Sequence, residues 1–420
     1  MESLGIVTDH LRPWVERAAI CAYELGVEPA ILTQCDDCDV SHLADVALSG
    51  VEVHSPEAVA RAAADVEGCV GLLSWDDALI VTTATAAALA GFPHPSVRGV
   101  QRARNKYSMR RRLDDAGLPG PRFGLVSDPA QCAVVVDAVG LPVIIKPING
   151  TGSALVRRAD TLAELDRHVR EMQLLAAETV SGLFTRAVPD PDGASRIPAE
   201  AFLVEECLTG PEIDLELVVR DGRTEVCLVS EVTFAPDSFR ESFFVHPPFS
   251  VPPHDVGALE NAAAEVVRCL EIDNCTANMT FMLTPSAGPV LVEVNPGRPG
   301  GHLLAAMAWH GRGVDIPSEA TALGLGQPGP SRGDSRLPAV AAVSFYPREF
   351  GTVEEIRGLV ELRQHPSVIS ALTMAGPGDV FTATRTIYPV VALVGGFTTR
   401  AELLDLHDEL TSLVEIDVRA

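Results

Sequence analysis

The first 95 residues alternate short apolar runs with stretches of helical spacing. The runs at 4–7, 30–33 and 71–74 have the length of strands, and residues 11–25 have the length and spacing of a helix. Strands that alternate with helices form a parallel sheet covered by those helices. The first strand is not followed by GxGxxG, and GxxxxGK[ST] does not occur in the sequence. This part therefore predicts a parallel α/β domain without the usual dinucleotide or P-loop signatures.

The rest of the chain divides at changes in its pattern. A basic amphipathic helix at 105–116 leads into mixed helix and strand patterns, and residues 181–199 are rich in Pro, Gly and Asp, as in a surface insertion. Alternating strands follow, and a Pro/Gly/Ser linker at 326–333 precedes a further α+β unit. A chain of 420 residues exceeds what one core usually organises. We predict four domains, at 1–100, 101–210, 211–328 and 335–420.

Charge and composition restrict the partners. A formal net charge of −25 argues against nucleic acids and anionic membranes, which attract basic surfaces. No apolar run approaches the roughly 20 residues of a membrane span, and the N-terminus lacks the features of a signal peptide. Nine scattered cysteines indicate reduced thiols and a cytoplasmic location. The lone CxxC segment, Cys35 to Cys38, is interpreted as two loop cysteines.

A strand that delivers a lysine into a glycine-rich turn is the first candidate site. The segment is Val143-Ile-Ile-Lys146-Pro-Ile-Asn149-Gly150-Thr151-Gly152-Ser153. A lysine ammonium is a compact charge suited to phosphate, and glycines let backbone N–H groups converge on phosphate oxygens. A β-hairpin with an exposed lysine is an equally open interpretation of the segment alone.

An apolar strand that runs into an acidic turn is the second candidate. It reads Phe202-Leu-Val-Glu205-Glu206-Cys207-Leu208-Thr-Gly210-Pro-Glu212. Its main chain could bind the edge of an adenine, with Glu212 accepting hydrogen bonds from ribose hydroxyls. It could also be a strand end with solvated carboxylates, so this segment alone is a weak indication.

The third candidate is the strand Pro289-Val-Leu-Val-Glu293-Val-Asn295, followed by Pro-Gly-Arg298. An unpaired charge in a buried strand is unfavourable. Glu293 and Asn295 alternate onto one face, and both present oxygen to a hard cation such as Mg²⁺. Arg298 follows within reach of phosphates held by that cation. A structural salt bridge is the alternative interpretation.

Together, in this order and spacing, the three segments resemble the ATP-grasp superfamily over about residues 1–325. The resemblance implies a parallel α/β domain followed by two α+β lobes that clasp ATP, and here a C-terminal α+β module. The segment Asn105-Lys106-Tyr-Ser-Met109-Arg110 is similar to the leading lysine motif of the family. By resemblance, Lys106 and Lys146 bind ATP phosphates, and a loop closes over them: Gly150, Thr151, Gly152 and Ser153.

The same resemblance implies the remaining ligand contacts. Glu212 would bind ribose, and Met282 would form an apolar floor under the base. Glu293 and Asn295 would hold Mg²⁺, for which Mn²⁺ could substitute, and Arg298 would act with Lys146 in catalysis. The backbone that would bind adenine belongs to Glu205, Glu206, Cys207 and Leu208.

The last 85 residues resemble the C-terminal module of L-amino acid ligases, such as the bacilysin-type dipeptide synthases. The similarity is carried by residues 341–347, 351–353, 366–368, 376–378 and 394–396. Residues 239–245 are also similar to a substrate loop of that group, although Ser242-Phe243 replaces its usual Gly-His. Glu241 in this loop is a candidate base for the amine, with Glu231 and His246 as alternatives.

Two positions depart from the family pattern. Thr280 stands where the family has its first metal carboxylate, and Gly297 stands where it has an arginine, with Arg298 one residue later. Thr280 remains a candidate metal ligand. Either another strand supplies the charge that the metal site lacks, or the site is weakened.

The resemblance implies an ATP-dependent ligase that joins a small carboxylate to an amine through an acyl phosphate, with a dipeptide-like product. ATP and Mg²⁺ are the expected cofactors, amino acids the expected substrates, and a homodimer one candidate assembly. A carboxyphosphate-forming enzyme that acts on bicarbonate or formate is one alternative. A degenerate ATP-binding protein, without ligation, is the other.

Overall fold

The computed structural model describes residues 2–9, 12–35, 43–178, 182–235, 239–252, 255–334, 337–382 and 389–419. Cys38 of the CxxC segment and Leu11 of the first predicted helix lie outside these ranges. In the described part, no helix is both long and apolar enough to cross a membrane.

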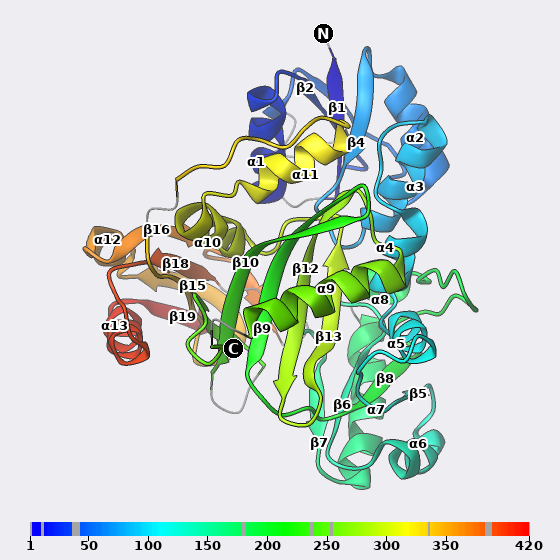
Figure 1. Cartoon of the computed structure of the whole chain (residues 1–420), viewed down its shortest axis with the longest axis vertical. Helices are drawn as coiled ribbons and strands as arrows, with labels where there is room; N and C mark the ends of the chain where they lie inside the picture. Colours follow the sequence, from blue (N-terminus) through cyan, green and yellow to red (C-terminus); the bar gives the residue numbers. More distant parts are fainter. Residues whose placement is uncertain are drawn as a thin grey trace.

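The N-terminal part is a four-stranded parallel sheet, as the alternating pattern predicts. In the order β3-β2-β1-β4, its strands are β1 (Ser3–Thr8), β2 (Glu28–Thr33), β3 (Val46–Leu48) and β4 (Cys69–Leu73). Its helices are α1 (Arg12–Glu24), α2 (Pro56–Asp65) and α3 (Ile80–Ala90). A later helix, α11 (Ile316–Gly324), adds Ala320 to the same apolar core and lies beside α1 (Figure 1). The chain therefore returns to its N-terminal part after the predicted boundary at residue 100.

Two short helices lead from this sheet into a small lobe. Ser96 caps α4 (Val97–Arg104), and Asn105 caps α5 (Lys106–Asp115) through its side chain. The lobe has an antiparallel sheet in the order β5-β8-β6-β7. Its elements are β5 (Phe123–Val126), η2 (Pro129–Gln131), α6 (Cys132–Val139), β6 (Val143–Pro147), β7 (Arg157–Ala159), α7 (Leu162–Glu178), α8 (Gly182–Thr185) and β8 (Phe202–Glu206).

An eight-stranded sheet forms the centre of the molecule, in the order β13-β12-β9-β10-β11-β14-β18-β16. Its first five strands are β9 (Glu212–Arg220), β10 (Arg223–Phe234), β11 (Glu241–His246), β12 (Cys275–Thr284) and β13 (Gly288–Pro296). Helix α9 (Val256–Leu270) packs on one face, and α10 (His302–Arg312) packs on the other. The small lobe lies below α5 in Figure 1, beside β13.

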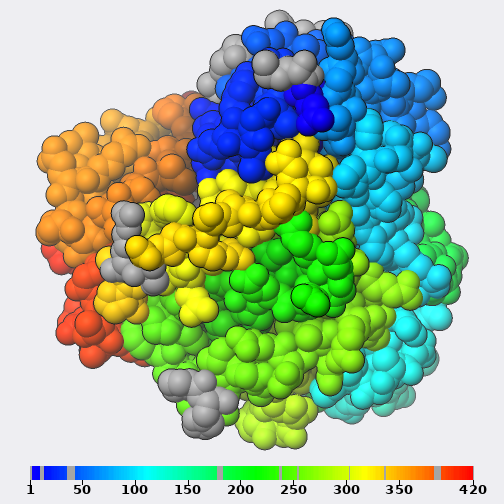
Figure 2. Space-filling model, turned by 45° about the horizontal axis from the view of Figure 1, so that its top comes forward, coloured from blue at the N-terminus to red at the C-terminus, as the bar shows by residue number. Residues whose placement is uncertain are grey.

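Three strands of the C-terminal residues extend this sheet, and three others form a small separate sheet. The strands β14 (Val340–Phe345), β16 (Val368–Thr373) and β18 (Val390–Val394) join the eight-stranded sheet through pairing of β14 with β11. The other elements of the C-terminal residues are β15 (Gly351–Arg357), α12 (Leu359–Gln364), β17 (Val380–Phe381), α13 (Arg400–Leu413) and β19 (Glu415–Arg419). Of these, β17, β15 and β19 form the small separate sheet, in that order. Figure 2 shows these residues in orange and red on one side, with the yellow segment between the blue N-terminal part and the green residues of the central sheet. The limits 335–420 remain a prediction.

Along the first half of β9, alternating side chains place apolar residues on one face of the central sheet and acidic residues on the other. Ile213, Leu215 and Leu217 belong to the apolar core beneath α9. Glu212, Asp214 and Glu216 alternate with them and therefore point to the opposite face. The acidic face carries the candidate site.

Candidate active site

The chain has only two lysines, Lys106 and Lys146, and all its other basic side chains except histidine are arginines. Lys106 is the first residue of α5, and Lys146 lies near the end of β6. Both are more than nine-tenths buried. The N–H of Lys106 donates to the carbonyl of Ile148 at 2.8 Å, which joins the start of α5 to the turn after β6. The fold thus brings the two predicted phosphate-binding segments together.

Each lysine has a buried carboxylate partner. Lys106 Nζ lies 3.1 Å from Glu293 Oε2, and Lys146 Nζ lies 2.6 Å from Glu205 Oε2. Arg110 also binds Glu205 and donates to the carbonyls of Leu291 and Val292. Burial disfavours the carboxylate charges, but the neighbouring cations lower the pKa values of Glu205 and Glu293 to about 2. Both are therefore ionised at neutral pH.

The same network affects the Lys106 ammonium. Burial lowers its pKa, and the nearby Arg104 and Lys146 charges add to this effect, whereas Glu293 opposes it. A second anion beside Lys106 would favour its charged form. This position therefore suits a phosphate oxygen.

The glycine-rich turn lies beside these lysines. Gly152 and Ser153 both have positive φ angles, 56° and 55°, a conformation that glycine adopts more readily than serine. Arg104 from α4 donates to Asn149 Oδ1 at 2.8 Å and to the carbonyl of Gly150 at 3.4 Å. These hydrogen bonds hold the first residues of the turn against α4.

Thr280 stands between two carboxylates on neighbouring strands. In the sheet register it pairs with Glu293 of β13 on one side and with Asp214 of β9 on the other. Its hydroxyl donates to Asp214 Oδ1 at 2.6 Å, and Asn295 Nδ2 donates to Glu293 Oε1 at 3.1 Å. A neighbouring strand therefore places a carboxylate beside the position where the family pattern is interrupted.

Further carboxylates surround this position. Burial raises the pKa of Asp214 to about 8, and burial also raises the pKa values of Glu216 and Glu241 to about 7. Burial and the charges of Asp214, Glu241 and Glu293 raise the pKa of Glu212 well above its usual range. This face of the sheet therefore favours bound positive charge.

The donor set fits Mg²⁺ that is shared with a phosphate ligand. Among the described residues, no group of three or more His, Cys, Asp or Glu side chains forms a metal site by itself. Mg²⁺ is commonly held by one or two carboxylates together with water and substrate phosphates. Glu293 and Asn295 supply such oxygens on one face of β13, beside the two lysines.

The segment predicted to bind adenine lies at the end of β8, and the predicted nucleoside contacts Glu212 and Met282 pair with each other on β9 and β12. The N–H groups of Glu206 and Cys207 donate to Arg122 and Pro142 carbonyls, whereas within the described ranges the N–H of Leu208 has no partner. A cavity of about 530 Å³ extends along the start of β9 and is lined in part by Glu212 and Met282. The two side chains predicted to contact ribose and base therefore line one cavity.

Arg298 is held from two directions. Its Nε donates to Asp77 Oδ1 at 2.8 Å. The loop that carries it is fixed to β9, because Glu216 accepts from the N–H of Gly300 at 2.9 Å. Asn278 Nδ2 of β12 also donates to Glu216, at 2.9 Å. A Cβ at position 300 would overlap the Glu216 carboxylate, so the close approach requires glycine there.

The three candidate bases differ in their surroundings. Glu231 accepts from Arg400 at 2.5 Å and from the N–H of Ser250 at 2.8 Å, and the His246 ring lies 2.7 Å from the Val229 carbonyl. Glu241 interacts electrostatically with Glu293, and its pKa lies near 7. Of the three, Glu241 has the surroundings best suited to accepting a proton near neutral pH.

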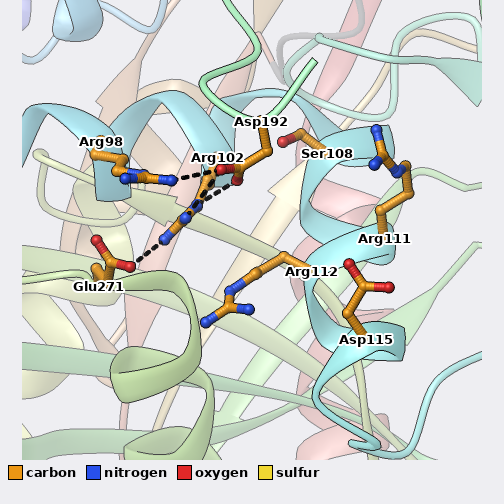
Figure 3. Close-up of a pocket in the computed structure, with 8 residues that line it drawn as sticks. All are labelled: Arg98, Arg102, Ser108, Arg111, Arg112, Asp115, Asp192 and Glu271. Carbon is orange, nitrogen blue, oxygen red and sulfur yellow. Dashed lines mark hydrogen bonds and ion pairs between the residues drawn. The ribbon is translucent and has the colours of Figure 1, made fainter.

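A second hollow, of about 330 Å³, is lined by residues of α4 and α5, by Asp192 and by Glu271 at the end of α9 (Figure 3). Arg102 is buried there between Asp192 and Glu271, at 2.6 and 2.7 Å, and Arg98 reaches Asp192 at 2.6 Å. Hydrogen bonds from Arg102 and Arg98 hold the pKa of Asp192 well below its usual range. The hollow contains no predicted site residue. Its ion pairs join the segment around Asp192 to α4.

Four residues of the site were not predicted from the sequence: Asp77, Arg104, Asp214 and Glu216. Asp214 and Glu216 have a sequence signal, because they alternate with buried apolar residues along a strand. Asp77 and Arg104 have no local signal and are recognised through their contacts.

Comparisons with known proteins agree with this geometry. Residues 139–306 match the model of the ATP-grasp domain. Human carnosine synthase 1 is 28% identical over 277 residues, which are 62% of this chain and 31% of that protein. The chain spans less than two thirds of the length of the curated relatives it matches, 59% for a Sinorhizobium fredii protein of uncharacterised function.

Solved structures extend the similarity to the whole chain. The L-amino acid ligase from Bacillus licheniformis has a TM-score of 0.78 at 19% identity, covering 100% of this chain and 99% of that one. N5-carboxyaminoimidazole ribonucleotide synthetase from Thermotoga maritima has a TM-score of 0.71 at 15% identity, covering 100% of both chains. The chain therefore has the ATP-grasp fold and contains an ATP-grasp domain at residues 139–306.

Proposed function

We propose that this protein is an ATP-dependent carboxylate–amine ligase that forms an amide bond through an acyl phosphate. The observation that carries the proposal is the convergence of the chain's two lysines with Glu293 and Asn295 beside a glycine-rich turn. That arrangement offers positive charge for phosphates and oxygen ligands for a cation in one place. The predicted similarity of the C-terminal residues to L-amino acid ligases supports amino acids as substrates.

In the proposed reaction, a carboxylate oxygen of the first substrate attacks the γ-phosphorus of ATP, and ADP leaves. The amine of the second substrate then attacks the acyl carbon, loses a proton to Glu241, and displaces inorganic phosphate. Lys106, Lys146 and Arg298 position the phosphates and neutralise the charge that is transferred. Main-chain groups from Glu205 to Leu208 would contact adenine.

Glu293 and Asn295 would hold Mg²⁺, with Asp214 supplying the charge that Thr280 lacks. When bound, the cation neutralises phosphate oxygens and orients the γ-phosphoryl group. The position of Asp214 supports this assignment, because Asp214 lies opposite Thr280 in the sheet register and accepts a hydrogen bond from its hydroxyl at 2.6 Å.

Release of ADP against a panel of acids and amines tests the proposal. We expect release to require an amino acid or a similar carboxylate, and an amide product to require a second, amine-bearing substrate. Full turnover sustained by bicarbonate alone would instead support the carboxyphosphate-forming alternative. The absence of Mg²⁺-dependent ATP consumption across the panel would support the degenerate protein.

Thr280→Glu should lower activity about tenfold or more in a working ligase. The new carboxylate would lie between Asp214 and Glu293, and like charges so close cannot all remain ionised. Thr280→Ser retains the hydroxyl that donates to Asp214 and is the matched control. Steady-state rates at saturating MgATP measure the effect. A gain of activity from a low base would show that the natural site is deficient.

The pH profile of kcat/KM tests Glu241. Its pKa near 7 predicts that the rate rises with pH through this region, because only the ionised carboxylate accepts a proton. Glu241→Gln should lower the rate and remove this limb of the profile. Retention of the limb in Glu241→Gln would assign the titration to another group, such as the substrate amine.

A further inference from the structure

The N-terminal part contributes one carboxylate to the centre of the site. Asp77 follows β4, and its side chain is almost nine-tenths buried. Its Oδ1 accepts from Arg298 Nε at 2.8 Å and from Arg104 Nη1 at 2.9 Å. A hydrogen bond with the Thr151 side chain also stabilises its charged form. One carboxylate therefore contacts three elements around the expected phosphate position.

The two arginines extend these contacts to the remaining parts of the site. Arg104 donates to Asn295 Oδ1 at 2.7 Å and to Asn149 Oδ1 at 2.8 Å, so it joins β13 to the glycine-rich turn. Arg298 lies in the loop that follows β13, and Glu216 holds this loop through the N–H of Gly300. Without the charge of Asp77, two buried guanidinium groups would lie close together with like charge, which favours their separation.

Asp77 has two competing interpretations. It could be a structural ion pair that fastens the N-terminal part to the lobes. Such a pair would affect stability but would not act on the chemistry through one particular arginine. The shared use of Oδ1 by Arg298 and Arg104 favours a more specific role, because this one atom holds the two guanidinium groups next to each other.

The geometry points to Asp77 as a positioning residue that orients Arg298 and Arg104 for phosphoryl transfer. This inference rests on the proposed ligase function and deepens it, since it makes the N-terminal part a component of the catalytic arrangement. Asp77 acts through the arginines and does not itself contact the transferred group. A displacement of about 1 Å in such an arrangement can lower a rate by about 10²-fold.

Kinetics of Asp77→Asn in the full chain test the inference, with MgATP and a mixture of the twenty amino acids as probes. We expect kcat to fall about tenfold or more while KM for ATP changes less than about threefold. Asp76→Asn is the matched control, because Asp76 is the neighbouring carboxylate and its Oδ1 accepts from the N–H of Ala78 at 2.9 Å, a bond that the amide oxygen of Asn can also accept. Equal kcat values for the two variants would overturn the inference.

A double-mutant cycle distinguishes positioning from a structural contact. In the Arg298→Ala background, Asp77→Asn should lower kcat by only a few-fold, because the group it positions is absent. The same loss in both backgrounds would overturn the inference. Asp77→Glu keeps the charge but lengthens the side chain, so it provides a second test if Asp77→Asn folds poorly; wild-type kcat in Asp77→Glu would also contradict the inference.

A measurement independent of catalysis separates this inference from the proposed function. Modification of Arg298 by an arginine-selective dicarbonyl, mapped by peptide mass spectrometry, should increase several-fold in Asp77→Asn and not in Asp76→Asn. Unchanged modification would overturn the inference even in an active ligase. Wild type without acid-dependent ADP release would overturn the ligase function, whereas the modification result would still report whether Asp77 holds Arg298.

Discussion

Lys146→Ala should lower kcat by about 10²-fold or more, because one preorganised charge at a transferring phosphoryl group is typically worth that much. The variant should remain folded, since Glu205 keeps its second partner, Arg110. Single-turnover formation of ADP measures the change, with thermal unfolding as the check on folding. Arg158→Ala is the matched control, because Arg158 lies on the adjacent strand, pairs with Asp160 and is half exposed.

The low lysine content provides an independent readout for the same claim. An amine-reactive reagent can label only Lys106, Lys146 and the chain's terminal amine. MgATP should protect both lysines from labelling if they bind its phosphates. An unchanged rate in Lys146→Ala, with normal ATP affinity and no protection of Lys146, would show that the turn after β6 is only a hairpin.

Glu293→Gln should also reduce turnover by about 10²-fold or more. Glu293 is ionised because Lys106 and Lys146 lower its pKa to about 2 against the effect of burial. The amide is nearly isosteric but has no charge, so both a cation and the Lys106 ammonium would lose an anionic partner. Rates over a range of Mg²⁺ concentrations should show a higher requirement for the cation.

Glu225→Gln controls for the loss of a carboxylate from the same sheet. Glu225 lies on β10, is largely exposed and pairs with Arg332. We expect its rate to match that of wild type. Little change in Glu293→Gln, with an unaltered Mg²⁺ requirement, would indicate a degenerate site in which Glu293 is only the partner of Lys106.

The parts of the site that were predicted from the sequence are local in the chain. Lys146 and the glycine-rich turn lie within eight residues, and Glu293 and Asn295 lie on one strand. A short segment contains both their spacing and their residue types, so their chemistry could be interpreted without the fold. The parallel beginning of the chain was predicted for the same reason, since its strands and helices alternate in sequence.

The remaining features depend on contacts between distant segments. Asp77 and Arg298 are 221 residues apart, and Asp214 reaches Thr280 across 66 residues. Only the pairing register of β9 with β12 shows that Asp214 lies beside the interrupted family position. Likewise, the pairing of β11 with β14 joins the C-terminal strands to the central sheet, which the linker at 326–333 did not indicate.

The scarcity of lysine is a further sequence signal for the site. The two lysines are the only ones in a chain with 32 Lys and Arg residues. Arginine serves at the other positions, including ion pairs on the surface and the buried contacts of Arg104 and Arg110. Arginine is a planar donor, whereas lysine is a compact charge. The presence of lysine at these two positions alone therefore favours a role for its compact charge there.

Transfer of an oxygen isotope tests the acyl phosphate most directly. With a first substrate whose carboxylate carries ¹⁸O, the account predicts that each amide formed releases inorganic phosphate containing one ¹⁸O, visible as a shifted ³¹P resonance. The bond that the amine breaks lies between the acyl carbon and this oxygen, so the oxygen leaves with phosphate. Amide formation with unlabelled phosphate, or with the label in AMP, would contradict the account.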